Sequence, residues 1–181
     1  MTPNRRDWMV GAGALAMATV AARGWSQPAD AAAAEAQAPP LPALGTSWTL
    51  PLLPMELLDG GRFEPARADG QVLVLYWWAS TCPFCAVTTP HLNAFWQRHR
   101  QRPGWQLLTL SIDRTREAAV RYLQQRGYAF PCAWVTPDIQ RAMPKPKGLP
   151  ITLVRGRDGR LLMAERGQLF AEDIDAIAQW L

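Results

Sequence analysis

The hydrophobic positions of the chain form short runs that predict buried β-strands alternating with helices. An uninterrupted apolar run at 72–78 and a mainly apolar run at 105–112 have the length of strands buried on both faces of a sheet. Residues 83–102 and 115–126 instead place apolar side chains at helical spacing. Further strands are predicted at 132–135 and 151–155. The alternation predicts an α/β domain.

Turn-forming residues extend this pattern at both ends of the domain. Asp59-Gly60-Gly61 predicts an N-terminal hairpin, and Arg157-Asp158-Gly159-Arg160 predicts a tight turn after which 161–167 returns antiparallel. Residues 171–181 are expected to form a closing helix, with Ile174, Ile177, Ala178 and Leu181 facing inward. The whole pattern predicts a central mixed sheet flanked by helices.

Two single residues are expected to shape the predicted helices. Asp113 is expected to cap the helix at 115–126. Pro90 lies within the helix at 83–102 and is expected to kink it. Residues 136–148 are expected to form a loop with one turn of helix.

The first 47 residues differ in composition from the domain. Arg5-Arg6-Asp7 is followed by 15 uncharged residues, 8–22, which are too few and too weakly apolar for a spanning helix. This pattern predicts an export signal at 1–26, and the paired arginines resemble a twin-arginine signal. An uncleaved anchor is the alternative, and it leaves the domain in the same compartment. Residues 27–47, rich in Ala and Pro, are expected to be a flexible linker before a domain at 48–181.

Composition limits the remaining possibilities. The chain has 181 residues, of which 49% are hydrophobic, so it has room for one globular domain besides the leader. Its net charge of +4 is too small to indicate nucleic-acid binding. Three cysteines are too few for a small domain stabilised mainly by disulfides.

The strongest chemical signal is Cys82-Pro83-Phe84-Cys85, placed between a buried strand and the start of a helix. A thiol at a helix N-terminus meets free N–H groups and the positive end of the helix dipole, which favour the thiolate. Cys82 is therefore expected to attack substrates. Cys85, one turn further on and more shielded, is expected to resolve the mixed disulfide by forming a Cys82–Cys85 disulfide.

Several motifs together resemble a known family. The stretch 78–85, Trp-Ala-Ser-Thr-Cys-Pro-Phe-Cys, resembles the active-site stretch of thioredoxin-fold proteins, and Pro90 matches the proline of their active-site helix. Gly148-Leu149-Pro150 before a strand matches the proline that this family holds in the cis conformation beside the dithiol. With the leader, the N-terminal hairpin and an extra βα unit after the active-site helix, the chain is similar to the TlpA/ResA-like periplasmic thiol–disulfide oxidoreductases.

The resemblance implies a thioredoxin fold and an exported enzyme that exchanges thiols and disulfides without an organic cofactor or a metal. It implies protein substrates with disulfides, an upstream membrane electron donor that resets the dithiol, and a monomeric state without nucleic-acid contacts. The backbone of Leu149 is expected to pair with an extended substrate segment. The residues expected to contact substrate are Trp78, Pro83, Phe84, Leu149 and Pro150.

The chain departs from the family where an acid usually accepts the proton of the resolving thiol. Many thioredoxins have an acid six residues before the first cysteine, where this chain has Tyr76. Much of the TlpA/ResA-like branch has Glu three residues after the second cysteine, where this chain has Thr88. Tyr76 is expected to pack in the core. Water, Glu56 or Glu64 are alternative acceptors.

The remaining cysteine and the two histidines could have structural roles or could take part in redox or metal chemistry. Cys132 opens a buried strand and is expected to be structural, with a redox role as the alternative. His91 or His99 could join Cys82 and Cys85 in a copper or zinc site, but the chain lacks a second cysteine pair. The cluster of Arg98, His99, Arg100 and Arg102 is expected to complement the dipole at a helix C-terminus, with partner docking or nucleic-acid contact as the alternative.

The direction of electron flow is expected to be reduction of substrate disulfides. DsbA-like oxidants place His just before the second cysteine, where this chain has the apolar Phe84. The alternatives are a DsbA-like disulfide oxidant and a non-enzymatic copper- or thiol-binding chaperone.

Overall fold

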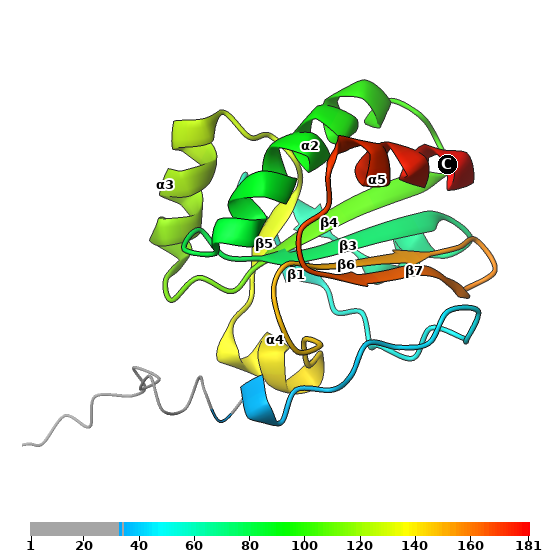
Figure 1. The fold of residues 1–181 in the computed structure, drawn as a ribbon, viewed down its shortest axis with the longest axis horizontal. Coiled ribbons are helices and arrows are strands. Elements are labelled where there is room, and N and C mark those ends of the chain that lie inside the picture. The colour runs from blue at the N-terminus through cyan, green and yellow to red at the C-terminus, as the bar shows by residue number, and fades with distance from the viewer. Residues whose placement is uncertain (1–32, 34) are drawn as a thin grey trace, which may run out of the picture.

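The computed structural model describes residue 33 and residues 35–181, so the expected export signal at 1–26 lies outside the described residues. The elements, named as in Figure 1, are β1 (Met55–Glu56), β2 (Arg62–Phe63), the 3-10 helix η1 (Pro65–Ala68), β3 (Val72–Trp78), α2 (Pro83–His99), β4 (Trp105–Ser111), α3 (Arg116–Arg126), β5 (Cys132–Trp134), α4 (Pro137–Ala142), β6 (Ile151–Arg155), β7 (Leu161–Arg166), α5 (Ala171–Asp175) and the 3-10 helix η2 (Ala176–Trp180).

The main sheet is mixed and has five strands in the order β5-β4-β3-β6-β7. Strands β3, β4 and β5 are parallel, whereas β6 runs antiparallel to β3 and β7 runs antiparallel to β6. The parallel strands are joined by α2 and α3, as crossover connections require. A separate antiparallel pair, β1 and β2, forms the expected hairpin. The expected mixed sheet flanked by helices is confirmed.

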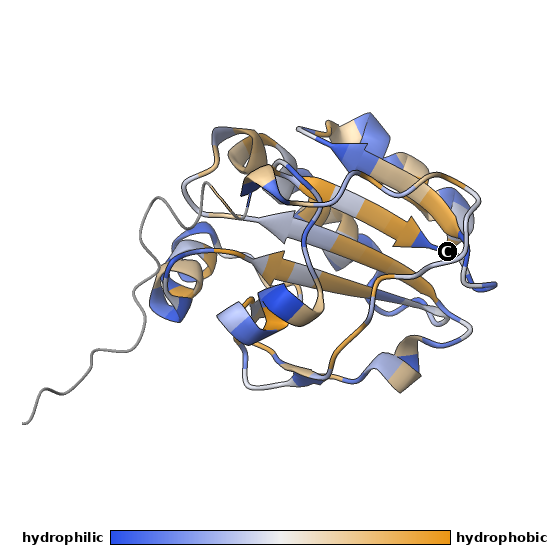
Figure 2. Ribbon diagram, turned by 90° about the horizontal axis from the view of Figure 1, so that it is seen from below, coloured by the Kyte–Doolittle hydropathy of each residue, from blue (hydrophilic) through white to orange (hydrophobic). Residues whose placement is uncertain are grey.

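Strand β3 is buried along its whole length because both faces of the sheet are covered. Its side chains alternate between the two faces, so Val74 and Tyr76 pack in one cluster and Leu75 and Trp77 in the other. Helices α2, α3 and α5 cover the first face (Figure 1). The hairpin, α4 and residues from the N-terminal segment cover the second, which Figure 2 shows from below with hydrophobic residues along its central strands.

The edges of the sheet are also covered. Leu58 donates its backbone N–H to the carbonyl of Cys132 at 2.7 Å, which ties the hairpin connection to β5. At the opposite edge, Gly45 donates its backbone N–H to the carbonyl of Leu161 in β7 at 2.8 Å, and Leu161 donates to the carbonyl of Thr46 at 3.0 Å. The backbone N–H of Trp48 donates to the carbonyl of Gly159 at 2.8 Å. Unpaired strand edges invite association with other chains, so these contacts protect the sheet.

These contacts differ from the expectation of a flexible linker for the described part of 27–47, whereas residues 27–32 and 34 lie outside the described residues. Residues 35–48, here called the strap, lie against the domain as part of its folded body. The strap is held there because Leu41 and Trp48 pack on the hydrophobic cluster of the second sheet face. Its backbone also pairs with β7. The folded contacts therefore begin before residue 48.

Two further expectations differ from the structure. The cap of α3 is Thr115, whose side chain accepts the N–H of Ala118 at 3.2 Å, because Asp113 is engaged in another contact. The C-terminal segment 171–181 is an α-helix followed by a 3-10 helix, and it still buries Ile174, Ile177 and Leu181. Among the residues that the structure describes, no helix is long and apolar enough to cross a membrane.

The aromatic residues beneath α2 provide a test of the packing between this helix and the sheet. Phe95 of α2 is fully buried and lies 5.7 Å, centroid to centroid, from the ring of Trp105 at the start of β4. We expect Phe95→Ala to lower the free energy of unfolding by about 3–5 kcal/mol, because it removes buried apolar surface and leaves a cavity. Urea denaturation measures this change.

Gln97→Ala is the matched control, because Gln97 lies on the exposed side of the same helix. It should change the free energy of unfolding by no more than about 0.5 kcal/mol. Equal effects of the two substitutions would contradict the assigned inner face of α2.

Candidate active site

Cys82 lies at the N-cap of α2, immediately after the loop that follows β3. Its backbone is extended, with φ −86° and ψ 116°, and its Sγ accepts the backbone N–H of Cys85 at 3.2 Å. Pro83 occupies the first turn, where a missing N–H costs no helical hydrogen bond. Cys82 is half-buried, so its sulfur combines access to solvent with a donor from the helix start. A thiolate at this position is stabilised by both the donor and the helix dipole.

Cys85 lies one turn further along and is almost completely buried. Burial raises the pKa of the Cys85 thiol, and its hydrogen bond with Cys82 raises that pKa further. Both cysteines are free thiols. The two sulfurs therefore differ in the way that the sequence predicted: one is accessible at the helix start, and the other is held as a protonated thiol behind it.

The loop before β6 approaches the dithiol from the neighbouring strand. Ile151 of β6 pairs with Trp77 of β3, so the preceding residues, Leu149 and Pro150, lie beside the loop that leads to Cys82. The Leu149–Pro150 peptide bond is cis, as the sequence predicted. Pro150 is buried and its carbonyl accepts the N–H of Gly167 at 2.9 Å, whereas Leu149 is half-buried.

A third segment, the connection from β7 to α5, is tied to the active-site helix by Thr88. The Thr88 hydroxyl donates to the carbonyl of Leu169 at 3.2 Å and accepts its N–H at 2.8 Å. Thr88 is fully buried, and it stands three residues after the second cysteine, where the resemblance would imply Glu. Its function in this structure is to attach a loop that lies near the dithiol.

Sequence reasoning missed the role of Asp113. Its carboxylate accepts the backbone N–H of Ser80 at 2.9 Å and the Ser80 hydroxyl at 2.6 Å, while its second oxygen accepts the Ser111 hydroxyl at 2.8 Å. These bonds hold the loop between β3 and Cys82 against the end of β4. The signal that could have found it is the position of Asp113 directly after a strand that is parallel to β3.

The predicted substrate-contact residues do not all reach the surface. Pro83 and Phe84 are exposed, and the Phe84 residue retains 55% of its accessible surface. Trp78 is fully buried and its ring lies 5.3 Å from that of Tyr122. The expectation that Trp78 contacts substrate is therefore wrong, because its position in β3 places it beneath the dithiol within the core.

The structure also narrows the choice of proton acceptor for Cys85. Tyr76 is fully buried and its hydroxyl hydrogen-bonds the Thr89 hydroxyl at 3.0 Å. Burial raises the pKa of Tyr76 well above its usual value, so its phenol is held in the neutral form. Glu56 and Glu64 belong to the hairpin on the opposite face of the sheet, and Glu64 pairs with Arg62. These two carboxylates are therefore not positioned to accept the proton directly.

Cys132 and His99 make their hydrogen-bond and ring contacts with residues other than the two active-site cysteines. Cys132 is buried in β5, and burial raises its pKa to about 11. His99, at the end of α2, packs against Phe95 with ring centroids 4.5 Å apart. Within the described ranges, no group of three or more His, Cys, Asp or Glu side chains could hold a metal ion.

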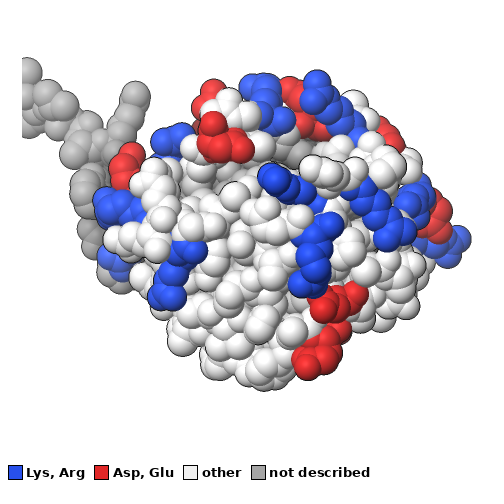
Figure 3. Space-filling view, turned by 90° about the horizontal axis from the view of Figure 1, so that it is seen from above, with Lys and Arg blue, Asp and Glu red and all other residues white. Residues whose placement is uncertain are grey.

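The basic cluster at the end of α2 contacts the C-terminal segment. Arg98 forms an ion pair with Asp175, and Arg102 donates to the carbonyl of Leu181 at 2.5 Å. Seen from above, Figure 3 shows a broad area without charged side chains, bordered by Lys and Arg and in places by Asp and Glu. The exposed Phe84 and Phe170 add apolar surface to α2 and α5.

Comparison with solved structures confirms the fold. A thiol:disulfide interchange protein of the thioredoxin family from Chlorobium tepidum TLS matches with a TM-score of 0.65 and 20% identity over 76% of this chain and 97% of its own. StoA from Bacillus subtilis matches with a TM-score of 0.59 and 17% identity over 77% and 98% of the two chains. A secreted thiol-disulfide isomerase from Corynebacterium glutamicum matches with a TM-score of 0.62 and 20% identity over 72% and 83%.

The search of curated proteins found no match. The model of the thioredoxin-like family matches residues 70–161, which include β3, both active-site cysteines, Pro150 and the turn into β7. This match spans about half of the chain and contains the dithiol together with the cis-proline loop. The chain therefore belongs to the thioredoxin-like family.

Proposed function

We propose that the protein is an exported thiol–disulfide oxidoreductase that reduces disulfides in periplasmic proteins. The observation that carries this proposal is the asymmetry of the two thiols in the first turn of α2. Cys82 is accessible and accepts the N–H of Cys85, whereas Cys85 is buried and its pKa is raised. This arrangement suits an attacking thiolate followed by a resolving thiol.

The reaction proceeds in two exchanges. The Cys82 thiolate attacks one sulfur of a substrate disulfide, which forms a mixed disulfide and releases the other substrate sulfur as a thiolate. Cys85 then loses its proton and attacks Cys82, which forms the Cys82–Cys85 disulfide and releases the second substrate sulfur. The dithiol loses two electrons and two protons, which end on the two substrate thiols. An upstream membrane donor then returns the dithiol to its reduced state.

The substrate platform is assigned to the residues around the dithiol. Phe84 offers exposed apolar surface, and the half-buried Leu149 has a backbone that can pair with an extended segment. The reductive direction rests on Phe84, because an apolar side chain donates no hydrogen bond that would stabilise the Cys82 thiolate further. Export rests on the pattern of residues 1–26, which predicts a signal.

The first test is the reactivity of the three thiols. In the reduced protein at neutral pH, we expect iodoacetamide to alkylate Cys82 rapidly, while Cys85 and Cys132 react slowly, because both are buried with raised pKa values. Mass spectrometry of peptides after timed quenching measures the three rates. Cys132→Ser is the control and should leave the fast rate unchanged. Rapid labelling of Cys85 would contradict the assigned roles.

The second test is capture of the mixed disulfide. Cys85→Ser removes the resolving sulfur, so this variant should accumulate mixed disulfides with an oxidised protein substrate. Cys82→Ser should capture none, since it lacks the accessible sulfur. Non-reducing electrophoresis separates the products, with Cys132→Ser introduced into both variants to remove the third thiol. Equal capture by both variants would overturn the proposed order of attack.

A further inference from the structure

A buried ammonium group lies beneath the loop that precedes the cis proline. The side chain of Lys145 is only 4% exposed. Its Nζ donates to the carbonyls of Pro146 at 2.7 Å and Gly148 at 2.9 Å, so it holds the loop from inside. A buried ammonium is costly without a partner of opposite charge. Its partner is Glu35, whose Oε2 lies 3.1 Å from Nζ.

Glu35 also binds the loop directly. Its second carboxylate oxygen accepts the backbone N–H of Gly148, which adjoins Leu149 and the cis proline. The N–H of the neighbouring Lys147 donates to the carbonyl of Pro39 at 3.1 Å. The strap thus contacts the loop through one side chain and one backbone carbonyl, and we call these contacts the strap clamp.

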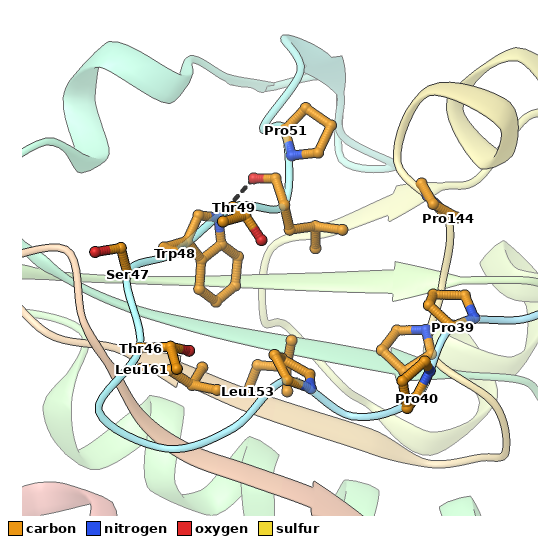
Figure 4. Close-up of a pocket in the computed structure, with 13 residues that line it drawn as sticks. Pro39, Pro40, Thr46, Ser47, Trp48, Thr49, Pro51, Pro144, Leu153 and Leu161 are labelled. Carbon is orange, nitrogen blue, oxygen red and sulfur yellow. Dashed lines mark hydrogen bonds between the residues drawn. The ribbon is translucent and has the colours of Figure 1, made fainter.

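The rest of the strap is fixed to the sheet. The backbone N–H of Gly45 donates to the carbonyl of Leu161 at 2.8 Å, and the N–H of Leu161 donates to the carbonyl of Thr46 at 3.0 Å. Further along, the indole N–H of Trp48 donates to the carbonyl of Leu50 at 2.6 Å. Figure 4 shows Pro39 and Pro40 near Pro144, and the strap continuing past Leu153 and Leu161 around a cavity of about 280 Å³. Glu35 is therefore attached to a segment that is itself anchored along β7.

The charges that face Glu35 favour its ionised form. Burial raises its pKa, but the hydrogen bonds from Gly148 and Lys145 and the positive charges of Lys145 and Lys147 lower it by more, so the pKa of Glu35 is lowered overall. A carboxyl group with a lowered pKa in the folded state stabilises that state above its unfolded pKa and loses this contribution as the pH falls. The Glu35 carboxyl group of the clamp is therefore ionised at neutral pH.

We propose that Glu35 is a positioning residue, which acts through Lys145 and Gly148 to hold the Leu149 backbone in place for substrate pairing. This proposal rests on the proposed function. The strap clamp ends one residue before Leu149, and the Arg166 side chain occupies the space that a Cβ at Gly148 would enter. Loss of the clamp frees the loop at the point where a substrate segment pairs with it.

The test is Glu35→Gln, which keeps the size of the side chain and removes its charge. Hydrogen exchange of the amides of Lys147 and Gly148 measures the clamp without any need for activity. Reduction of oxidised insulin, measured as kcat and KM, tests substrate positioning. We expect faster exchange at both amides and a KM raised roughly 3- to 10-fold, which corresponds to the net contribution of about one ordinary hydrogen bond. The kcat value and the alkylation rate of Cys82 should stay unchanged.

Asp175→Asn is the matched control, because it also removes a carboxylate from an ion pair, that of Arg98 at the far end of α2. It should alter neither the exchange of the loop nor KM. Glu35→Asp, which keeps the charge, should recover part of the KM loss. Unchanged exchange in Glu35→Gln, or faster exchange with an unchanged KM, would overturn the positioning role. Wild-type protein that reduces no disulfide would contradict the proposed function, and the positioning role with it, even where exchange shows the clamp.

Discussion

The site depends on the junction at which a strand buried on both faces becomes the first turn of a helix. Strand β3 fixes the residue at which the chain leaves the core, and α2 begins at Cys82 after only a short loop. The first cysteine therefore receives a helix N–H while it remains accessible, and the second is carried into the core by a single turn. We expect two chemically identical side chains to differ in reactivity, because a helix start favours charge and the core disfavours it.

Three loops from distant parts of the chain must meet at that junction, and each is held by a buried polar contact. Asp113 anchors the loop before Cys82, Thr88 attaches the segment before α5, and Glu35 with Lys145 supports the loop before the cis proline. Backbone segments outside helices and strands need such partners, because buried N–H and C=O groups are costly when left unpaired. The same contacts that satisfy the backbone therefore also set the shape of the proposed substrate platform.

The local patterns of the sequence predicted the strands, the active-site helix and the dithiol, because each depends on residues that are neighbours in the chain, whereas the cis proline was expected from the family resemblance. The contacts of Asp113, Thr88 and Glu35 join residues 33, 81 and 113 positions apart, so no local pattern contains them. The strap was expected to be flexible because its Ala and Pro content shows no packed face, whereas its order comes from backbone pairing with β7. Trp78 was assigned to the surface although it ends a run that predicts burial on both faces.

The central claim is that this dithiol gives electrons to substrates, and its reduction potential tests that claim most directly. Equilibration with glutathione, followed by the fluorescence of the buried Trp77 and Trp78, measures the potential. Stabilisation of Cys82 by the helix start alone should leave the couple nearer to thioredoxin, at about −270 mV, than to DsbA, at about −120 mV. We expect a value on the reducing side of about −180 mV. A potential of about −120 mV would contradict the reducing role and make the protein a disulfide donor.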